Sequence, residues 1–290
     1  MSSYNIMNKK LIFIENVNIK GEKKNILYKG LLANINVLIT KDIDLCDYIF
    51  LDFRDFNKIK NYKSDYLKKL VIIDYRDDPN EVFNTKCLKY FKRSVVDKRN
   101  MKLINYNREI IPISYCLKQE VLQFENLFEY DRYIDIAIFF RPGGSSYRSK
   151  IARFIKEKFS NYNIFVGFAG INGGIGRNSM QMDYYEKMFH SKIVVTCNPD
   201  NWEGDYRTWE ALSTGSLIFV DNMLTPITYP LINEKHIIFY DKNNLLELAE
   251  KILFYLNNLE LAKKISKQGN HYALKYHKPS DRIDYILSYL

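Results

Sequence analysis

The residues best suited to chemistry lie between positions 197 and 215, in a polar segment that joins two apolar runs. The runs, Lys192–Thr196 and Ser216–Asp221, have the composition of buried strands, and the segment between them predicts a loop followed by a helix. Strand, loop, helix and strand in this order form one βαβ crossover, with the loop at the carboxyl end of the first strand. Because ligands of open α/β sheets bind at that end, this segment is a candidate binding site.

The helix of this crossover is predicted to begin at Gly204-Asp205, so that its free amides face the loop and can hold a phosphate group. Arg207 and Glu210 are three residues apart and share one helix face near that end. The carboxylate can accept hydrogen bonds from the two hydroxyls of a ribose, while the arginine binds phosphates. This pattern predicts a nucleotide-sugar site. A structural interpretation is the alternative, with Asp205 as an N-cap, Gly215 as a helix-ending glycine and a solvated Arg207–Glu210 pair.

The segment from Asn198 to Asp221 resembles the donor site of GT-B glycosyltransferases, most closely the exostosin-like group of bacteria and large DNA viruses. Its core is WEGDYRTWEAL, residues 202–212, followed by a small-residue turn with Gly215. The resemblance implies that Glu210 holds the ribose and that Arg207 and the segment Gly204, Asp205 and Tyr206 hold the diphosphate. Glu203 and Glu210 are seven residues apart rather than eight, a departure from the common retaining families that weighs against a retaining mechanism.

Alternating strand-like and helix-like segments along the chain predict an α/β fold with two parallel sheets. In the first half the expected strands are Leu11–Asn16, Val37–Thr40, Tyr48–Phe53, Leu70–Asp74 and Ile110–Ser114, and the expected helices are Asn25–Asn34 and Asp65–Lys69. In the second half the further strands are Ile134–Phe140, Asn163–Phe168 and His236–Tyr240, and the helices are Ser145–Phe159, Gln181–Ser191, Asn243–Asn257, Leu259–Tyr276 and Ser280–Leu290.

This order of elements is that of the GT-B plan, in which two Rossmann-like domains face a cleft. The expected division is an acceptor-side domain over residues 1–125, a nucleotide-sugar-binding domain over 126–278, and a C-terminal helix over 279–290 that packs back on the first domain. The junction is placed within Gln119–Tyr133, which is acidic and aromatic and has no clear strand period.

Two further segments are candidate loops of the site. Arg141–Lys150 follows the first strand of the second half, and its Arg148 is the expected second diphosphate contact because a guanidinium suits two phosphate oxygens. A Gly-Gly turn with a serine N-cap is the alternative there. Gly167–Gly176 is glycine-rich but never satisfies the G-x-G-x-x-G spacing. This argues against an NAD-dependent epimerase or dehydrogenase and predicts a loop near the donor base or the interdomain cleft.

Three carboxylates, Asp74, Asp77 and Asp78, follow the most apolar strand of the first half and are the candidate catalytic bases. An inverting transferase needs one such base to take the proton of the acceptor hydroxyl. Asp74 is the first candidate because it ends the strand, and an Asp-Pro turn with exposed acids is the alternative interpretation. Asp52 and Asp55, near Arg54, are in reserve after the neighbouring strand.

Composition sets the remaining limits. The net charge of +9 fits anionic ligands, but the basic residues are dispersed and no nucleic-acid partner is expected. The cysteines form no CxxC pair and the histidines have no metal-ligand spacing, which favours reduced thiols and no metal site. No apolar run approaches the roughly 18 residues of a membrane span. The expectation is a soluble cytoplasmic protein, acting in the host cytoplasm if it is viral.

These patterns together predict a glycosyltransferase that moves a sugar from a nucleoside diphosphate sugar, with UDP as the expected nucleotide, to a glycan hydroxyl. The expected reaction is inverting, with no metal ion and no cofactor besides the donor itself. The alternative is a non-catalytic basic module that binds glycan or nucleic acid and retains a degenerate donor site.

Overall fold

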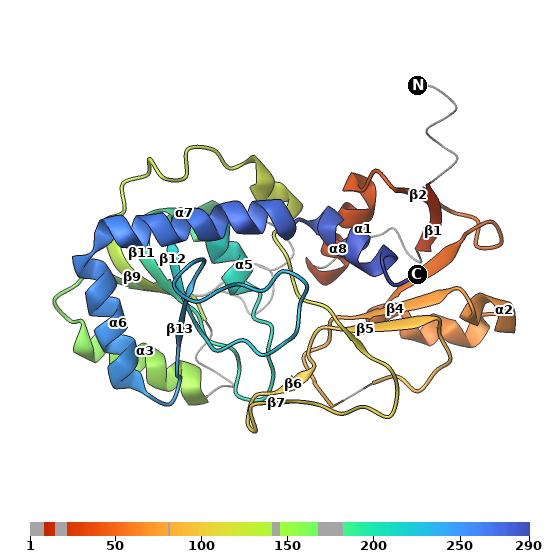
Figure 1. Ribbon diagram of the computed structural model, residues 1–290, viewed down its shortest axis with the longest axis horizontal. Coiled ribbons are helices and arrows are strands. Elements are labelled where there is room, and N and C mark those ends of the chain that lie inside the picture. Colours follow the sequence, from red (N-terminus) through yellow and green to blue (C-terminus); the bar gives the residue numbers. More distant parts are fainter. Residues whose placement is uncertain (1–8, 15–21, 81, 141–145, 168–181) are drawn as a thin grey trace.

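The computed structural model describes residues 9–14, 22–80, 82–140, 146–167 and 182–290. Figure 1 shows two α/β halves side by side along the long axis, each built on its own sheet. Among the described residues, the strands of the two sheets pair only in parallel, as the alternation of elements predicts. The boundaries of the domains, as distinct from the two sheets, stay a prediction.

The first half is built on a six-stranded sheet of order β2-β1-β3-β4-β5-β8. Its strands are β1 (Lys10–Ile14), β2 (Val37–Thr40), β3 (Tyr48–Asp52), β4 (Leu70–Asp74), β5 (Lys89–Lys92) and β8 (Ile111–Pro112). Every residue of β4 is buried, because helical layers cover both faces of this central strand, and its sequence is accordingly an unbroken apolar run. One face packs against α1 (Glu22–Ala33), and the other against a 3-10 helix, η2 (Phe53–Asn61), and α2 (Ser64–Leu67).

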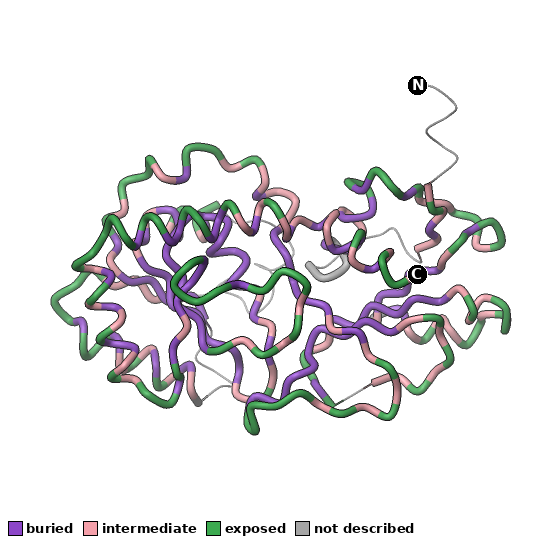
Figure 2. The backbone as a smooth tube through the Cα atoms, viewed as in Figure 1, coloured by how far each residue is buried: buried purple, intermediate pink, exposed green. Residues whose placement is uncertain are grey.

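The second half is built on a five-stranded sheet of order β10-β9-β11-β12-β13. Its strands are β9 (Ile134–Ile138), β10 (Ile164–Val166), β11 (Ser191–Val195), β12 (Leu217–Asp221) and β13 (Ile238–Tyr240). Its helices are α3 (Ser146–Lys158), α4 (Met182–Phe189), α5 (Arg207–Leu212), α6 (Leu245–Asn257) and α7 (Leu259–Tyr276). Figure 2 shows the strands of both halves as the buried interior and the outer helices as partly exposed.

Several elements of the first half were not foreseen, among them the 3-10 helix η2 and three short strands. β5 is a four-residue strand with a lysine at each end, and Lys92 is buried there only because it pairs with Asp74. The two-residue strands β6 (Val96–Asp97) and β7 (Lys102–Leu103) form an antiparallel hairpin too short to leave a pattern. Between residues 119 and 133 the structure has one short 3-10 helix, η3 (Gln119–Gln123), in the expected junction.

The last helix, α8 (Pro279–Leu287), crosses back and packs on α1 of the first half, as expected (Figure 1). Gly30 of α1 lies so close to α8 that a Cβ on it would stand 2.6 Å from the carbonyl oxygen of Pro279. Beside this contact, the side-chain Nδ2 of Asn34 donates to Ser280 O at 3.1 Å and to Asp284 Oδ1 at 2.7 Å. The close packing therefore depends on a residue without a side chain.

The chain passes between the halves twice, and Arg282 of α8 joins the two passages. Its guanidinium donates to Ser114 Oγ and Tyr115 O, both at 2.9 Å, and to His277 Nδ1 at 2.6 Å. The Leu117 amide also donates to His277 O at 2.9 Å. Burial, and then the positive charge of Arg282, lower the pKa of His277 to about 2, so this imidazole stays neutral in the folded protein.

We expect Gly30→Ala to lower the free energy of unfolding by about 1–3 kcal/mol, because the added methyl group forces α1 and α8 apart. Urea unfolding followed by circular dichroism measures the change. The sign of the change in unfolding free energy distinguishes close packing from open space around Gly30. With free space around the helix, alanine would stabilise the protein by up to about 1 kcal/mol relative to glycine. A gain in stability would contradict the close packing of α8 on α1.

We expect the buried neutral His277 to make stability fall as the pH falls below the unfolded pKa of 6.5. Below pH 6.5 the imidazole of His277 is protonated in the unfolded chain, whereas in the folded chain it stays neutral down to about pH 2. Between these two pH values the free energy of unfolding drops by about 1.4 kcal/mol per pH unit. Urea unfolding of wild type and His277→Gln at about pH 7 and about pH 5 should show a loss smaller by about 2 kcal/mol in the variant. His271→Gln, at an exposed position of α7, is the control and should keep the wild-type slope.

Candidate functional site

The helix α5 begins at Arg207, two or three residues later than the sequence predicts, because Gly204 has a φ of 109°, which a right-handed helix does not contain, and its carbonyl oxygen accepts from Arg93. The Asn198 side chain follows β11, and its Oδ1 accepts hydrogen bonds from the amides of Gly204 at 2.9 Å and Asp205 at 3.0 Å. Asp205 Oδ1 accepts from the Arg207 amide at 3.2 Å. The amides of Gly204 and Asp205, which the sequence assigns to a diphosphate, thus both donate to Asn198 within the protein, and their role in donor binding stays a prediction.

Asp205 lies between the two arginines that were expected to bind the diphosphate. Arg207 Nη1 donates to Asp205 Oδ1 at 2.9 Å, and Arg148 Nη2 donates to Asp205 Oδ2 at 3.3 Å. The same guanidiniums bind the ends of two strands, with Arg207 Nε on Phe139 O at 2.8 Å and Arg148 Nε on Cys197 O at 2.8 Å. The structure therefore brings Arg148, Asp205 and Arg207 together at the carboxyl ends of β9 and β11.

Burial alone would lower the pKa of Arg207, but Asp205, Tyr184 and Glu210 around it raise that pKa above its usual value. For Arg148, burial dominates over the attraction of Asp205, and its pKa is lowered. Among the described residues, Arg207 Nη2 has no hydrogen-bond partner, because Arg207 donates only through Nε, Nη1 and its backbone amide. That nitrogen is the donor at this site with capacity for an anion.

Glu210 lies one helical turn beyond Arg207, and both of its carboxylate oxygens have partners. Lys118, in the passage between the halves, places its Nζ 3.0 Å from Oε1, and the Tyr184 hydroxyl of α4 donates to Oε2 at 2.8 Å. A carboxylate has about four lone-pair sites, so each oxygen can still accept one further hydroxyl. Burial and the charge of Glu210 raise the pKa of Tyr184, which keeps this hydroxyl a donor.

Two buried cations of the first half reach this segment of the second. Arg93 Nη1 donates to Glu203 O at 3.1 Å and Gly204 O at 2.9 Å, next to a glycine with φ of 109°. Lys98, in the β6–β7 hairpin, forms ion pairs with Asp221 Oδ2 at 3.0 Å and Glu203 Oε2 at 3.5 Å. The carboxyl ends of the two sheets therefore meet at the loop before α5.

The three candidate bases have different surroundings. Asp74 is fully buried and accepts from Arg76, from Lys92 and from the Tyr90 hydroxyl at 2.7 Å. Burial opposes its ionisation, but these cations and hydrogen bonds outweigh it and lower its pKa. These partners enclose the Asp74 carboxylate, and its role as a catalytic base stays a prediction.

Asp77 and Asp78 are exposed, and Asp77 is the one connected to the second half. Its side chain is half exposed and accepts a hydrogen bond from Arg93, the same guanidinium that binds Glu203 O and Gly204 O. Asp78 accepts from the Asn80 amide at 2.8 Å, in the turn before Pro79. Of the reserve residues, Asp52 and Asp55 are buried at the end of β3 and the start of η2.

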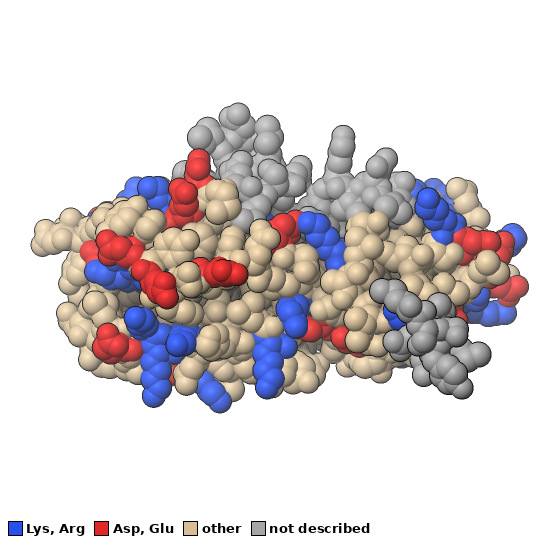
Figure 3. Space-filling model, turned by 90° about the horizontal axis from the view of Figure 1, so that it is seen from above, with Lys and Arg blue, Asp and Glu red and all other residues tan. Residues whose placement is uncertain are grey.

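The glycine-rich parts of two predicted loops, 141–145 and 168–181, lie outside the described residues. Within the described part of the chain, no three His, Cys, Asp or Glu side chains are grouped as metal ligands would be. No helix among the described residues combines the length and the apolarity needed to cross a membrane. All four cysteines are free thiols. Figure 3 shows acidic and basic side chains side by side on the face in view.

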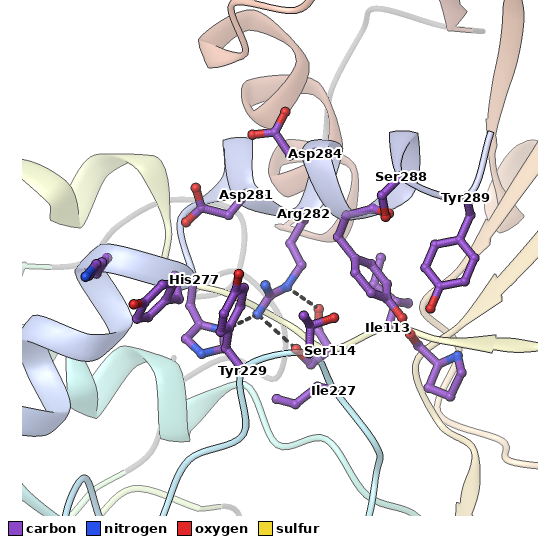
Figure 4. A pocket seen from close by; sticks show the side chains of 15 residues that line it. Ile113, Ser114, Ile227, Tyr229, His277, Asp281, Arg282, Asp284, Ser288 and Tyr289 are labelled. Atoms are coloured by element: carbon purple, nitrogen blue, oxygen red, sulfur yellow. Dashed lines mark hydrogen bonds between the residues drawn. The ribbon is translucent and has the colours of Figure 1, made fainter.

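A cavity of about 590 Å³ lies at the junction of the two halves, bounded by the ends of β8 and α7, by α8 and by the loop after β12. Figure 4 shows Arg282 at its centre, directed toward Ser114 and His277, with Tyr229 and Tyr289 at its sides. None of the residues predicted for the site lines this cavity. It belongs to the passages between the halves.

Four residues of this site were not found by sequence reasoning: Arg93, Lys98, Lys118 and Tyr184. Each acts on a residue that is 26 to 111 positions away in the sequence, so no local spacing could reveal the pairing. Arg93 and Lys98 border the short apolar run Val95–Val96, which is the only local sign of their burial.

The chain is similar to known glycosyltransferases in part of its sequence and in its fold. Residues 168–288 match the family model described as glycosyl transferase-like. No curated protein sequence matches the chain. The similar solved structures include an α-glucosyltransferase in complex with UDP and a 13-mer DNA containing an HMU base, with a TM-score of 0.61 and 10% identity, covering 97% of this chain and 99% of that one.

Two further structures agree in fold along nearly their whole length. A glycosyltransferase from Rickettsia africae has a TM-score of 0.59 and 12% identity, with 97% of each chain covered. HepE from Anabaena, in complex with UDP and glucose, has a TM-score of 0.56 and 9% identity, covering 97% of this chain and all of that one. The protein therefore has the GT-B fold of two Rossmann-like domains, and its second half carries a match to glycosyl transferase-like proteins.

Proposed function

We propose that this protein is a glycosyltransferase that moves a sugar from a nucleoside diphosphate sugar to a hydroxyl of a glycan. UDP is the nucleotide we expect, because two of the similar structures hold UDP, at the level of fold alone. The exostosin-like subgroup, the inverting course, the absence of a metal requirement and the cytoplasmic location are parts of the same proposal. The chain would act as a hexosyl- or pentosyltransferase.

The observation that carries the proposal is the position of Glu210. Its carboxylate lies at the carboxyl ends of the second sheet, within the segment that matches the family model, and it is oriented by Lys118 and Tyr184. Each oxygen retains the capacity to accept one ribose hydroxyl. A carboxylate that already has its orientation binds such a ligand without losing further side-chain freedom.

Arg207 and Arg148 would stabilise the departing diphosphate. Negative charge develops on that group as the glycosyl bond breaks, and fixed cations nearby lower the barrier. Arg207 Nη2 is available for a phosphate oxygen, while Asp205 keeps both guanidiniums in place. The role first expected of the Gly204 and Asp205 amides passes to these side chains, and Tyr206, directly before α5, stays a proposed contact of the diphosphate.

The base that we propose is Asp77, with Asp78 as the second candidate and Asp74 as a structural carboxylate. Asp77 is half exposed, and Arg93 holds it next to the backbone of Glu203 and Gly204. A base there would take the proton of the acceptor hydroxyl on the side of the sugar opposite the diphosphate, which gives inversion. Analysis of the product anomer by NMR tests this course, and retention would remove the need for the base.

A specific observation also favours a second candidate, the non-catalytic basic module. The amides of Gly204 and Asp205 and the carboxylate of Asp205 are occupied by partners within the chain, as a degenerate donor site would be. With a net charge of +9, such a module would bind anionic glycan or nucleic acid with an affinity that falls steeply with salt. It would not discriminate among nucleoside diphosphates.

We expect UDP to raise the melting temperature of the wild type and Glu210→Gln to weaken UDP binding by about 10- to 100-fold. The amide cannot replace a charged acceptor of two ribose hydroxyls, and each lost charged hydrogen bond costs about 1.5–3 kcal/mol. Thermal shift with UDP, GDP, CDP and ADP, followed by calorimetric titration, measures both effects. Glu250→Gln, on the exposed face of α6, is the matched control and should bind as the wild type. No shift with any of the diphosphates would refute the transferase and leave the binding module.

We expect Asp77→Asn to lower kcat for UDP-sugar turnover by about 100-fold or more, with UDP affinity unchanged, because general-base catalysis contributes about 10²–10⁴-fold. Release of UDP from the donor, with water or added glycan as the acceptor, is the assay. Asp78→Asn should retain most of the activity. Asp74→Asn should instead lower stability by about 3–5 kcal/mol, because it leaves buried Lys92 without its ion-pair partner. Full activity in both Asp77→Asn and Asp78→Asn would exclude a base in this turn.

A further inference from the structure

Lys98 is a fully buried lysine of the first half, and its ion-pair partners Glu203 and Asp221 belong to the second half. It stands in the turn of the β6–β7 hairpin, near the bottom of the view in Figure 1, between the two halves. The hairpin docks through its backbone, because Asp97 forms a bridge with Trp202 and the Lys98 amide donates to Asn201 O at 3.3 Å. The lysine side chain then continues inward to Asp221 and Glu203.

The ammonium group of Lys98 is enclosed by oxygens. Asp221 Oδ2 lies at 3.0 Å, Glu203 Oε2 lies at 3.5 Å, and Asn222 O accepts a further hydrogen bond. The side chain of Lys98 is 0% exposed, and those of Glu203 and Asp221 are 0% and 2% exposed. A ligand cannot reach this ammonium, so Lys98 can influence a site only through the groups that it holds.

One ion pair, between Lys98 and Asp221, and then a series of hydrogen bonds lead from Lys98 to α5. Asp221 Oδ1, on the carboxylate that pairs with Lys98, accepts from the Asn198 amide at 2.7 Å and from its side chain at 3.0 Å. Asn198 Oδ1 accepts from the amides of Gly204 and Asp205. Asp205 binds Arg207, the first residue of α5. Each residue in this series is held by the residue before it and in turn holds the next one.

Glu203 forms a second branch of the same network. Its oxygens accept from the amides of Thr225 at 2.6 Å and Leu224 at 2.7 Å, which fixes the loop after β12. The adjacent cation, Arg93, binds the carbonyl oxygens of Glu203 and Gly204 and packs its guanidinium 4.5 Å from the Trp202 ring centre. The whole entry to α5 is therefore held from the first half by two buried cations.

We propose that Lys98 is a positioning residue for the donor-binding helix: through Asp221, Asn198 and Asp205 it sets the start of α5, so that nucleotide binding by the second half depends on a first-half lysine that never touches the nucleotide. This inference rests on the proposed function for its effect on UDP. The order of the loop before α5 is a separate consequence, which does not require any ligand.

The first measurement is amide hydrogen exchange in peptides that cover residues 198–212, by mass spectrometry on the full chain without ligand. In Lys98→Met the amides of Gly204 and Asp205 should exchange at least about tenfold faster, since their acceptor Asn198 is no longer held. The matched control is Lys102→Met, which removes the same charge from an exposed position of the same hairpin. It should exchange as the wild type. Wild-type exchange in a folded Lys98→Met protein would overturn the proposal.

The second measurement is the UDP dissociation constant by calorimetric titration, at a temperature at which circular dichroism shows every variant fully folded. We expect an increase of about tenfold or more in Lys98→Met and less than about twofold in Lys102→Met. Because both variants lose one positive charge, general attraction of the nucleotide cannot explain a difference. Faster exchange with unchanged UDP affinity would overturn the positioning role. A wild type that binds no nucleoside diphosphate would refute the proposed function, and the exchange experiment would still decide the role of Lys98 at the loop.

Removal of Lys98 alone leaves two buried carboxylates without their cation and can prevent folding. The double variant Lys98→Met with Asp221→Asn removes one charge of each sign, so that the cluster keeps its net charge. The amide at position 221 retains an oxygen for Asn198 but loses its ion pair with the first half. Faster exchange and weaker UDP binding are expected again, and wild-type values in this variant would overturn the proposal.

Discussion

The pairing of buried charge between the two halves is the constraint on which the rest of the structure depends. Lys98 and Arg93 belong to the first half, and both bind groups of the second. Lys98 pairs with the carboxylates of Glu203 and Asp221. Arg93 donates to the carbonyl oxygens of Glu203 and Gly204, and it also pairs with Asp77 of its own half. A buried ammonium costs several kcal/mol unless every partner is in place, so this contact has a narrow range of allowed geometries. The relative position of the halves and the path of the loop before α5 are therefore set together.

The candidate site is built on that fixed loop. The carboxylate of Asp205 accepts hydrogen bonds from both Arg148 and Arg207. Arg207 also binds the carbonyl oxygen of Phe139 after β9, and Arg148 binds that of Cys197 after β11. Glu210, one turn further along α5, is oriented by residues from α4 and from the passage between the halves. Each charged group has a partner that directs it, as a preorganised binding site requires. The hydrogen-bonding capacity left over is the donor Nη2 of Arg207 and the unused acceptor lone pairs of Glu210.

A different set of contacts joins the halves on the side of α7 and α8. There Arg282 ties Ser114 and Tyr115 of one passage to His277 of the other, and α8 lies against α1 at the level of Gly30. The apolar core is continuous from α1 and α8 through Tyr115 and Trp209 to α5 and α7. The two halves are thus connected by an apolar layer on one side and by a network of buried charges on the other, with α5 between them.

The sequence alone determined the alternation of strands and helices, the two parallel sheets, the returning last helix and the segment that resembles a donor site, because periodicity and local spacing are properties of neighbouring residues. Leu70–Asp74 and Val37–Thr40 were predicted with their observed bounds. Only the tertiary structure decided what the polar residues of that segment do. Asn198 accepts from the amides of Gly204 and Asp205, and the φ of 109° at Gly204 delays the start of α5 to Arg207. Arg76 and Lys92 pair with the buried carboxylate of Asp74. The partners Arg93, Lys98, Lys118 and Tyr184 come from distant positions, and their effect arises from low dielectric and enclosed geometry, which no local pattern encodes.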